Sequence, residues 1–210
     1  MADVRTDRDL DASPAPSAPT AEEAPRWRGV HHLALTTNDM DATVRFYHGV
    51  LGMRTVATIA NADFKHYFFE VGPGNTLAFF QWLGHDVGTI EKPAGIPPDF
   101  ATQFDHVSFH LPDEQALLDL SARLAVHACE VTEVVDHGIM KSIYFTDPNG
   151  ISLEASFWVA DATGRPADYG DRAQMFSDPD PVPAIVELAS AGELAWTPST
   201  RNLGEGDDPS

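Results

Sequence analysis

The sequence predicts an α+β fold of two βαβββ repeats whose mixed sheets curl around a shared cup. Residues 65–82 and 141–158 align without a gap, so that Lys, Phe, Gly, Leu and Trp recur at the same spacing. Each of these hairpin-like segments follows a short apolar strand and an amphipathic helix. We place the repeats at about 29–83 and 103–158, within one domain covering 29–160.

The first repeat opens with a strand at 30–36 and continues into a helix at 40–51. Asp39 is suited to cap the first turn of this helix, and Gly52 is suited to end it. The apolar side chains at helical spacing form one stripe, which consists of Met40, Val44, Tyr47 and Leu51. A hairpin at 65–82 completes the unit.

The second repeat begins with a strand at 104–110, followed by a helix through Leu117, Leu120 and Leu124 and by a strand around 131–135. Side chains alternate between the two faces of a strand. In the closing hairpin this alternation places Tyr144 and Glu154 on a face with small polar side chains, namely Ser108, Ser142, Ser152 and Ser156. That face is expected to line the cup.

Composition limits the partners and the compartment. The net charge of −19 disfavours nucleic acid, whose phosphates would be repelled. No run approaches 18 apolar residues, so no membrane span is expected, and the single cysteine favours a reducing cytoplasm. Residues 1–28 read as a disordered arm and 161–210 as an extended tail, whose apolar patch at 184–186 can either pack on the domain or cover its pocket.

Three distant residues on predicted strands fit one metal site: His32, His106 and Glu154. Two imidazoles and one carboxylate on one side of an ion such as Fe(II) or Mn(II) leave positions open for substrate and oxygen. A structural site, by contrast, closes its shell. The neighbouring His31 is expected to point the opposite way, toward the helices.

The phrases HHLALTTNDMDATVRFYHGVLGM, FDHVSFH and SIYFTDPNGISLE resemble the vicinal oxygen chelate superfamily, which includes glyoxalase I, extradiol dioxygenases, fosfomycin-resistance thiol transferases and bleomycin-binding proteins. The resemblance covers about residues 29–158. It implies that the same three residues bind a divalent metal, with Fe(II) favoured and Mn, Ni, Co or Zn possible. It also implies a small-molecule substrate and a homodimer, with units that pair within one chain or across two.

Glyoxalase I-like relatives carry a fourth, acidic ligand in the first hairpin, where this chain has Ala78. Three ligands resemble the extradiol dioxygenases and the fosfomycin transferases. Tyr144 lies ten residues before Glu154, where extradiol enzymes carry a tyrosine that hydrogen-bonds the substrate oxygen. His137 is the nearest counterpart of their acid/base histidine, and His110 is the alternative.

The sequence therefore leads us to expect an Fe(II) extradiol-type dioxygenase acting on a catechol-like aromatic. Tyr144 and His137 would be its catalytic residues. Two alternatives stay open. The first is a glyoxalase-like lyase or isomerase, or a thiol transferase, that uses another divalent metal. The second is a non-enzymatic small-molecule binding or resistance protein.

Overall fold

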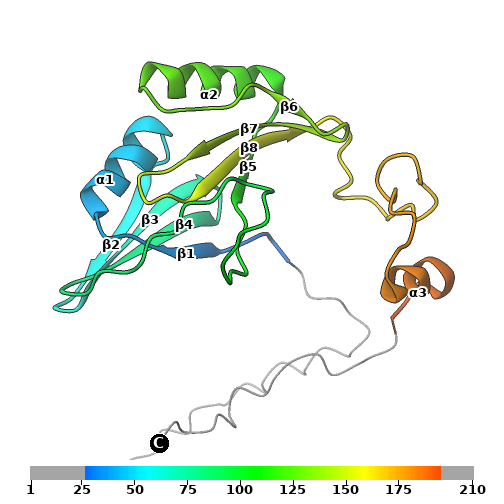
Figure 1. Ribbon diagram of the computed structural model, residues 1–210, viewed down its shortest axis with the longest axis horizontal. Coiled ribbons are helices and arrows are strands. Elements are labelled where there is room, and N and C mark those ends of the chain that lie inside the picture. Colours follow the sequence, from blue (N-terminus) through cyan, green and yellow to red (C-terminus); the bar gives the residue numbers. More distant parts are fainter. Residues whose placement is uncertain (1–26, 195–210) are drawn as a thin grey trace, which may run out of the picture.

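The computed structural model describes residues 27–194, so nearly all of the predicted N-terminal arm and the last 16 residues of the chain lie outside the described residues (Figure 1). The first unit contains β1 (His32–Thr36), α1 (Met40–Val44), the π-turn η1 (Arg45–Val50), β2 (Thr55–Ala60), β3 (Phe64–Gly72) and β4 (Asn75–Trp82). The second contains β5 (Val107–His110), α2 (Glu114–Val126), β6 (Val135–Asp136), β7 (Met140–Thr146) and β8 (Ser152–Trp158).

The strands form two four-stranded mixed sheets, in the orders β1-β4-β3-β2 and β5-β8-β7-β6. In each sheet the edge strand, β1 or β5, runs parallel to its neighbour, and the hairpin strands are antiparallel. The sheets curl without closing into a barrel, and α2 covers one face of the second sheet (Figure 1). The predicted fold class of two βαβββ repeats is confirmed.

Strand register shows which positions of the two units are equivalent. Leu33 of β1 is aligned with Leu77, and Val107 of β5 is aligned with Leu153. Because Leu77 and Leu153 match in the sequence repeat, the preceding residues of the edge strands, His32 and His106, are equivalent as well. Ala78 lies opposite Phe68 as Glu154 lies opposite Tyr144, which confirms Ala78 as the counterpart of the carboxylate.

Local structure differs from the sequence prediction in two places. The helix begins as expected, because the Asp39 side chain accepts from Ala42 N–H at 3.0 Å. Its second half is a short π-helix, which ends where Leu51 N–H donates to Phe46 O. The strand expected at 131–135 is wrong in extent, since only β6 and an isolated bridge at Val131 pair with β7. Between them the Thr132 hydroxyl accepts from Tyr144 N–H in place of a backbone carbonyl.

A single apolar core joins the two units through their helices. Tyr47 packs on Phe69 and Phe79 of the first sheet, and its neighbour Phe46 contacts Phe145 of the second sheet at a ring separation of 6.5 Å. The buried Tyr47 hydroxyl donates to Asp147 Oδ2 at 3.0 Å, although 100 residues separate them. The apolar faces of both sheets are therefore turned toward the helices, which leaves their opposite faces to carry a site.

The helix α3 (Pro183–Ala191) belongs to the C-terminal segment and lies to one side of the sheets (Figure 1). None of its residues is buried, and the apolar patch at 184–186 lies on it. Among residues 27–194, no helix has the length and apolar character needed to cross a bilayer.

Candidate functional site

Four of the five predicted site residues meet on the polar face of the second sheet. Glu154 on β8 lies directly opposite Tyr144 on β7, and His106 precedes the neighbouring strand β5 by one residue. The surrounding side chains are hydroxyls, and Ser108 and Ser156 are joined at 3.0 Å. The alternation of β7 turns Ile143 and Phe145 into the core, so that Tyr144 must face the other way.

A continuous chain of hydrogen bonds connects these residues. The Tyr144 hydroxyl donates to Glu154 Oε1 at 3.0 Å, and His137 Nε2 lies 2.9 Å from the same hydroxyl. Since the phenol has one proton and gives it to Glu154, the His137 nitrogen must be the donor in their contact. His106 Nε2 lies 3.0 Å from the second carboxylate oxygen of Glu154. His110 makes no such contact, because it sits further along β5, in register with Ser156.

The charge states follow from burial and from these partners. Burial raises the pKa of the Glu154 carboxyl, but the hydroxyls of Ser142, Ser108 and Tyr144, together with His106, outweigh it and leave the pKa below its usual value. Glu154 is 4% exposed and is held as a carboxylate. Burial and the Glu154 charge raise the pKa of Tyr144, so the phenol keeps its proton at neutral pH.

His32, the fifth predicted residue, lies on the other sheet. Its ring contacts Phe68 at 5.9 Å, and within residues 27–194 of one chain no three His, Cys, Asp or Glu side chains gather in a way that holds a metal. His31 does not turn toward the helices as expected. It is exposed, and its Nδ1 lies 2.8 Å from His32 Nδ1, because the strand begins only at His32 and leaves His31 free of the alternation.

The corresponding face of the first sheet is aromatic rather than polar. His66 stacks on Phe80 at 3.6 Å and 13°, and Phe80 stacks on Trp82 at 5.2 Å and 5°. Burial lowers the pKa of His66, and the nearby His32 adds to the effect. The two half-faces therefore differ in chemistry, with flat rings on one and a carboxylate with hydroxyls on the other.

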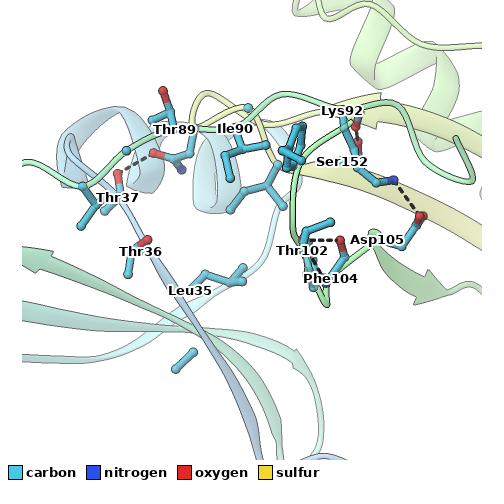
Figure 2. Close-up of a pocket in the computed structure, with 17 residues that line it drawn as sticks. Leu35, Thr36, Thr37, Thr89, Ile90, Lys92, Thr102, Phe104, Asp105 and Ser152 are labelled. Atoms are coloured by element: carbon cyan, nitrogen blue, oxygen red, sulfur yellow. Dashed lines mark hydrogen bonds and ion pairs between the residues drawn. The ribbon is translucent and has the colours of Figure 1, made fainter. Parts of the chain in front are cut away.

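The sequence reasoning missed Asp105 and Lys92. Asp105 Oδ1 lies 2.5 Å from His106 Nδ1, and Lys92 Nζ donates to Asp105 Oδ2 at 2.6 Å. Asp105 could have been found from the sequence, because it directly precedes the candidate ligand His106. Nothing in the sequence indicates Lys92. Figure 2 shows both residues at one end of a cavity of about 330 Å³ beneath the connecting segment 83–104.

This cavity adjoins the polar face but does not include His106 or Glu154. A larger cleft, of about 950 Å³, lies between residues 91–96 of the connecting segment and the second sheet. Tyr144 and Ser152 line it. The connecting segment thus forms one wall of the cleft that Tyr144 lines.

The spacing of the His106 and Glu154 donor atoms fits two ligands of one ion. Ligand atoms about 2.1 Å from a first-row divalent metal and at right angles are about 3.0 Å apart. The observed separation of Nε2 and Oε2 is 3.0 Å. Asp105 on the far nitrogen of His106 matches the outer-shell carboxylate that usually orients a metal-binding imidazole.

Comparison with known proteins gives consistent relatives at low identity. A Bacillus subtilis protein is 27% identical over 81% of this chain and 45% of its own length. It is named as a ring-cleaving dioxygenase, MhqE, by assignment. Lactoylglutathione lyase of Haemophilus influenzae is 25% identical over 59% of this chain and 87% of its own length. The chain thus spans about half the length of the dioxygenase-named relative.

Among solved structures, a glyoxylase/bleomycin resistance protein/dioxygenase domain from Frankia sp. EAN1pec has a TM-score of 0.54 and 21% identity, over 63% of this chain and 98% of that one. It supports the fold alone. The family model of the Glyoxalase/Bleomycin resistance protein/Dioxygenase superfamily matches residues 29–155, which is more than half of the chain. The protein belongs to that superfamily, whose members include ring-cleaving dioxygenases and lactoylglutathione lyases by name.

Proposed function

We propose that this protein is a metal-dependent, extradiol-type ring-cleaving dioxygenase that acts on a catechol-like aromatic. The observation that carries the proposal is the hydrogen-bonded chain His137–Tyr144–Glu154–His106 on the polar face of the second sheet. It combines two donor atoms at metal-ligand spacing with a protonated phenol and a histidine beside them. The name of the B. subtilis relative supports the same reaction class.

His106 and Glu154 would hold the metal, together with His32. When bound, an Fe(II) ion would supply Lewis acidity toward a substrate hydroxyl and a redox partner for dioxygen. Three protein ligands leave open positions on one side of such an ion. The absence of an acidic side chain at Ala78 supports a three-ligand set, since alanine cannot bind a metal.

A second copy of the chain would bring His32 to this site. His32 begins β1 and His106 adjoins β5, and these are the edge strands of the two sheets. Joining the β1 edge of one copy to the β5 edge of another would bring the two equivalent histidines side by side. We therefore propose a homodimer with two sites, each of which takes His32 from one chain and His106 with Glu154 from the other.

Tyr144 and His137 would act on the protons of the substrate. The Tyr144 hydroxyl lies beside the donor atoms of the proposed metal ligands and is fixed by Glu154 and His137. From there it is placed to donate a hydrogen bond to the substrate oxygen that gains negative charge. His137 Nε2, next in this hydrogen-bonded chain, is placed to exchange a proton with Tyr144.

The aromatic face of the first sheet supports a planar aromatic substrate. In the proposed dimer this face would stand across the cup from Glu154, with Phe68 and Phe80 as its central rings. Offset stacking of a substrate ring on such a surface contributes about 0.5–1.5 kcal/mol beyond burial of its area.

Lyase chemistry is a second candidate, because two lactoylglutathione lyases match over nearly their whole length. In that case His32, His106 and Glu154 would hold Ni, Co, Zn or Mn as a Lewis acid, without dioxygen.

One experiment separates the two candidates. The full chain is loaded anaerobically with Fe(II), or in parallel with Ni(II), and tested for oxygen uptake with a panel of catechols and for lyase turnover with hemithioacetals. Ring cleavage with uptake of one O₂ per ring in the iron form alone supports the dioxygenase. Turnover of a hemithioacetal by the nickel form, with no oxygen uptake by the iron form, would assign the lyase instead.

A further inference from the structure

The segment that connects the two repeats is tied to the second sheet at one point. Its Lys92 donates to Asp105 Oδ2 at 2.6 Å, and its Gly95 N–H donates to Asp105 Oδ1 at 2.8 Å. The backbone oxygen of Lys92 also accepts from the Ser152 hydroxyl at the start of β8. Figure 2 shows Lys92 between Asp105 and Ser152.

Burial makes the Lys92–Asp105 contact different from a surface ion pair. The Lys92 side chain is 9% exposed, so its charge has lost most of its water and requires a partner. Asp105, whose side chain is 47% exposed, accepts from both Lys92 Nζ and the Gly95 N–H, so the pair lies at the edge of the buried region. The ion pair between Lys141 of β7 and Glu114 of α2 is more exposed and lies on the helix side of the sheet.

Asp105 uses its remaining capacity on the imidazole of His106. The Nδ1–Oδ1 distance is 2.5 Å, which requires a proton on Nδ1 because a carboxylate only accepts. The Nε2–Oε2 contact of 3.0 Å also needs an N–H donor, because Glu154 is a carboxylate, so the ring is held between two carboxylates. A metal ion bound at Nε2 would take the place of that donor, and Asp105 would keep the proton on Nδ1 and the ring in place.

We infer that Lys92 and Asp105 are positioning residues for His106, so that the connecting segment sets the tautomer and orientation of a ligand of the proposed metal site. The effect on metal binding rests on the proposed function, but the orientation of His106 can be measured without any metal. Lys92 acts by holding Asp105, and Asp105 acts on the ring directly.

The first test is side-chain NMR of the ¹⁵N-labelled, metal-free full chain, which reports separately whether Nδ1 and Nε2 of His106 carry a proton. The His106 signals are assigned by their loss in His106→Asn. We expect a protonated Nδ1 in the wild type, in Lys92→Arg and in the control Lys141→Met. Asp105→Ala should lose the proton on Nδ1 and keep only the one on Nε2 that faces Glu154. The double variant Lys92→Met with Asp105→Ala, which leaves no unpaired buried charge, should do the same.

The second test is Co(II) affinity by competition with a chelating indicator. Loss of an outer-shell carboxylate is expected to weaken Co(II) binding by about 10- to 100-fold in Asp105→Ala, with a smaller loss in Lys92→Met. Lys92→Arg, which keeps the positive charge, and the control Lys141→Met should both bind Co(II) with the wild-type affinity. Melting temperatures measured beside the affinities separate a loss of orientation from a loss of fold.

The outcomes separate the two claims. If Nδ1 of His106 carries no proton in the wild type, or keeps it in both variants that lack Asp105, the positioning role is overturned whatever the metal does. If wild-type chain binds no Co(II) while the NMR result holds, the metal site of the proposed function fails and the orientation of His106 by Asp105 stands.

Discussion

Tyr144 and Glu154 lie directly opposite each other on β7 and β8, and the phenol donates to the carboxylate at 3.0 Å. The tight turn between the strands makes this pairing a property of the hairpin alone. The same register in the first hairpin pairs Phe68 with Ala78, which have neither a hydroxyl nor a carboxylate. The two copies of one structural unit therefore have different faces, one with a carboxylate and hydroxyls and one aromatic.

We predict that Tyr144→Phe lowers turnover by about 10- to 1000-fold with the metal content unchanged, because one donor to developing negative charge is lost while the ring and its packing remain. Oxygen uptake with a responsive catechol and iron per chain are the measurements. The control is Tyr67→Phe on β3, which removes a phenol hydroxyl from a residue outside the hydrogen-bonded chain. Wild-type turnover in Tyr144→Phe would remove this hydroxyl from the mechanism.

His106→Ala and Glu154→Ala should each abolish stoichiometric metal binding and leave the fold intact. Both residues lie on the face opposite the packed side chains Leu153 and Ala155, so their removal leaves the core filled. Elemental analysis and circular dichroism check the two parts. His85→Ala, at an exposed position after β4, is the control. A full equivalent of metal in either variant would show that the ligands are elsewhere.

The proposed sharing of sites between two chains predicts complementation. His32→Ala and His106→Ala should each bind no metal alone. When the two are unfolded together and refolded as a mixture, hybrid dimers would contain one site with both histidines intact. Up to one metal per hybrid dimer should therefore return, together with activity. Metal content that stays at zero in purified hybrids would mean that the site closes within one chain.

Tyr47→Phe is predicted to destabilise the fold by about 1–3 kcal/mol, because the buried Asp147 carboxylate loses a donor that water does not replace. Tyr47 is fully buried, and Asp147 is 4% exposed. Asp147 also accepts from the N–H groups of Asn149 and Ile151, so the turn itself should persist. Urea unfolding followed by fluorescence gives the free energy, and a value equal to wild type would contradict the estimate.

Ionisation of Tyr47 is expected to lower the free energy of unfolding at alkaline pH. Burial and the adjacent Asp147 charge raise the pKa of Tyr47 well above its ordinary value, which is about 10 in the unfolded chain. The stability that the buried phenol contributes is therefore complete below a pH of about 10, and it is lost as the pH rises from there toward the pKa of the folded state. The wild type should lose stability more steeply above pH of about 10 than Tyr47→Phe, in unfolding curves at matched pH. Parallel curves would assign the alkaline loss to other groups.

The sequence by itself determined the two repeats, the faces of their strands and the candidate ligands. Alternation along β7 and β8 is a local property with a period of two residues, so it placed Tyr144 and Glu154 on one face without any knowledge of the fold. The gapless match of the two hairpins likewise identified Ala78 as the counterpart of Glu154. The helix caps at Asp39 and Gly52 were readable because capping depends on a few adjacent residues.

Only the tertiary structure decided how these parts meet. Phe46 and Tyr47 join the two units through contacts with Phe145 and Asp147, and within residues 27–194 of one chain no third His, Cys, Asp or Glu side chain completes a metal-binding group with His106 and Glu154. The contacts of His137 with Tyr144 and of Lys92 with Asp105 come from irregular segments with no periodic pattern. Their positions depend on contacts with other parts of the chain that no local rule encodes, because a loop takes its path from the surfaces on which it lies.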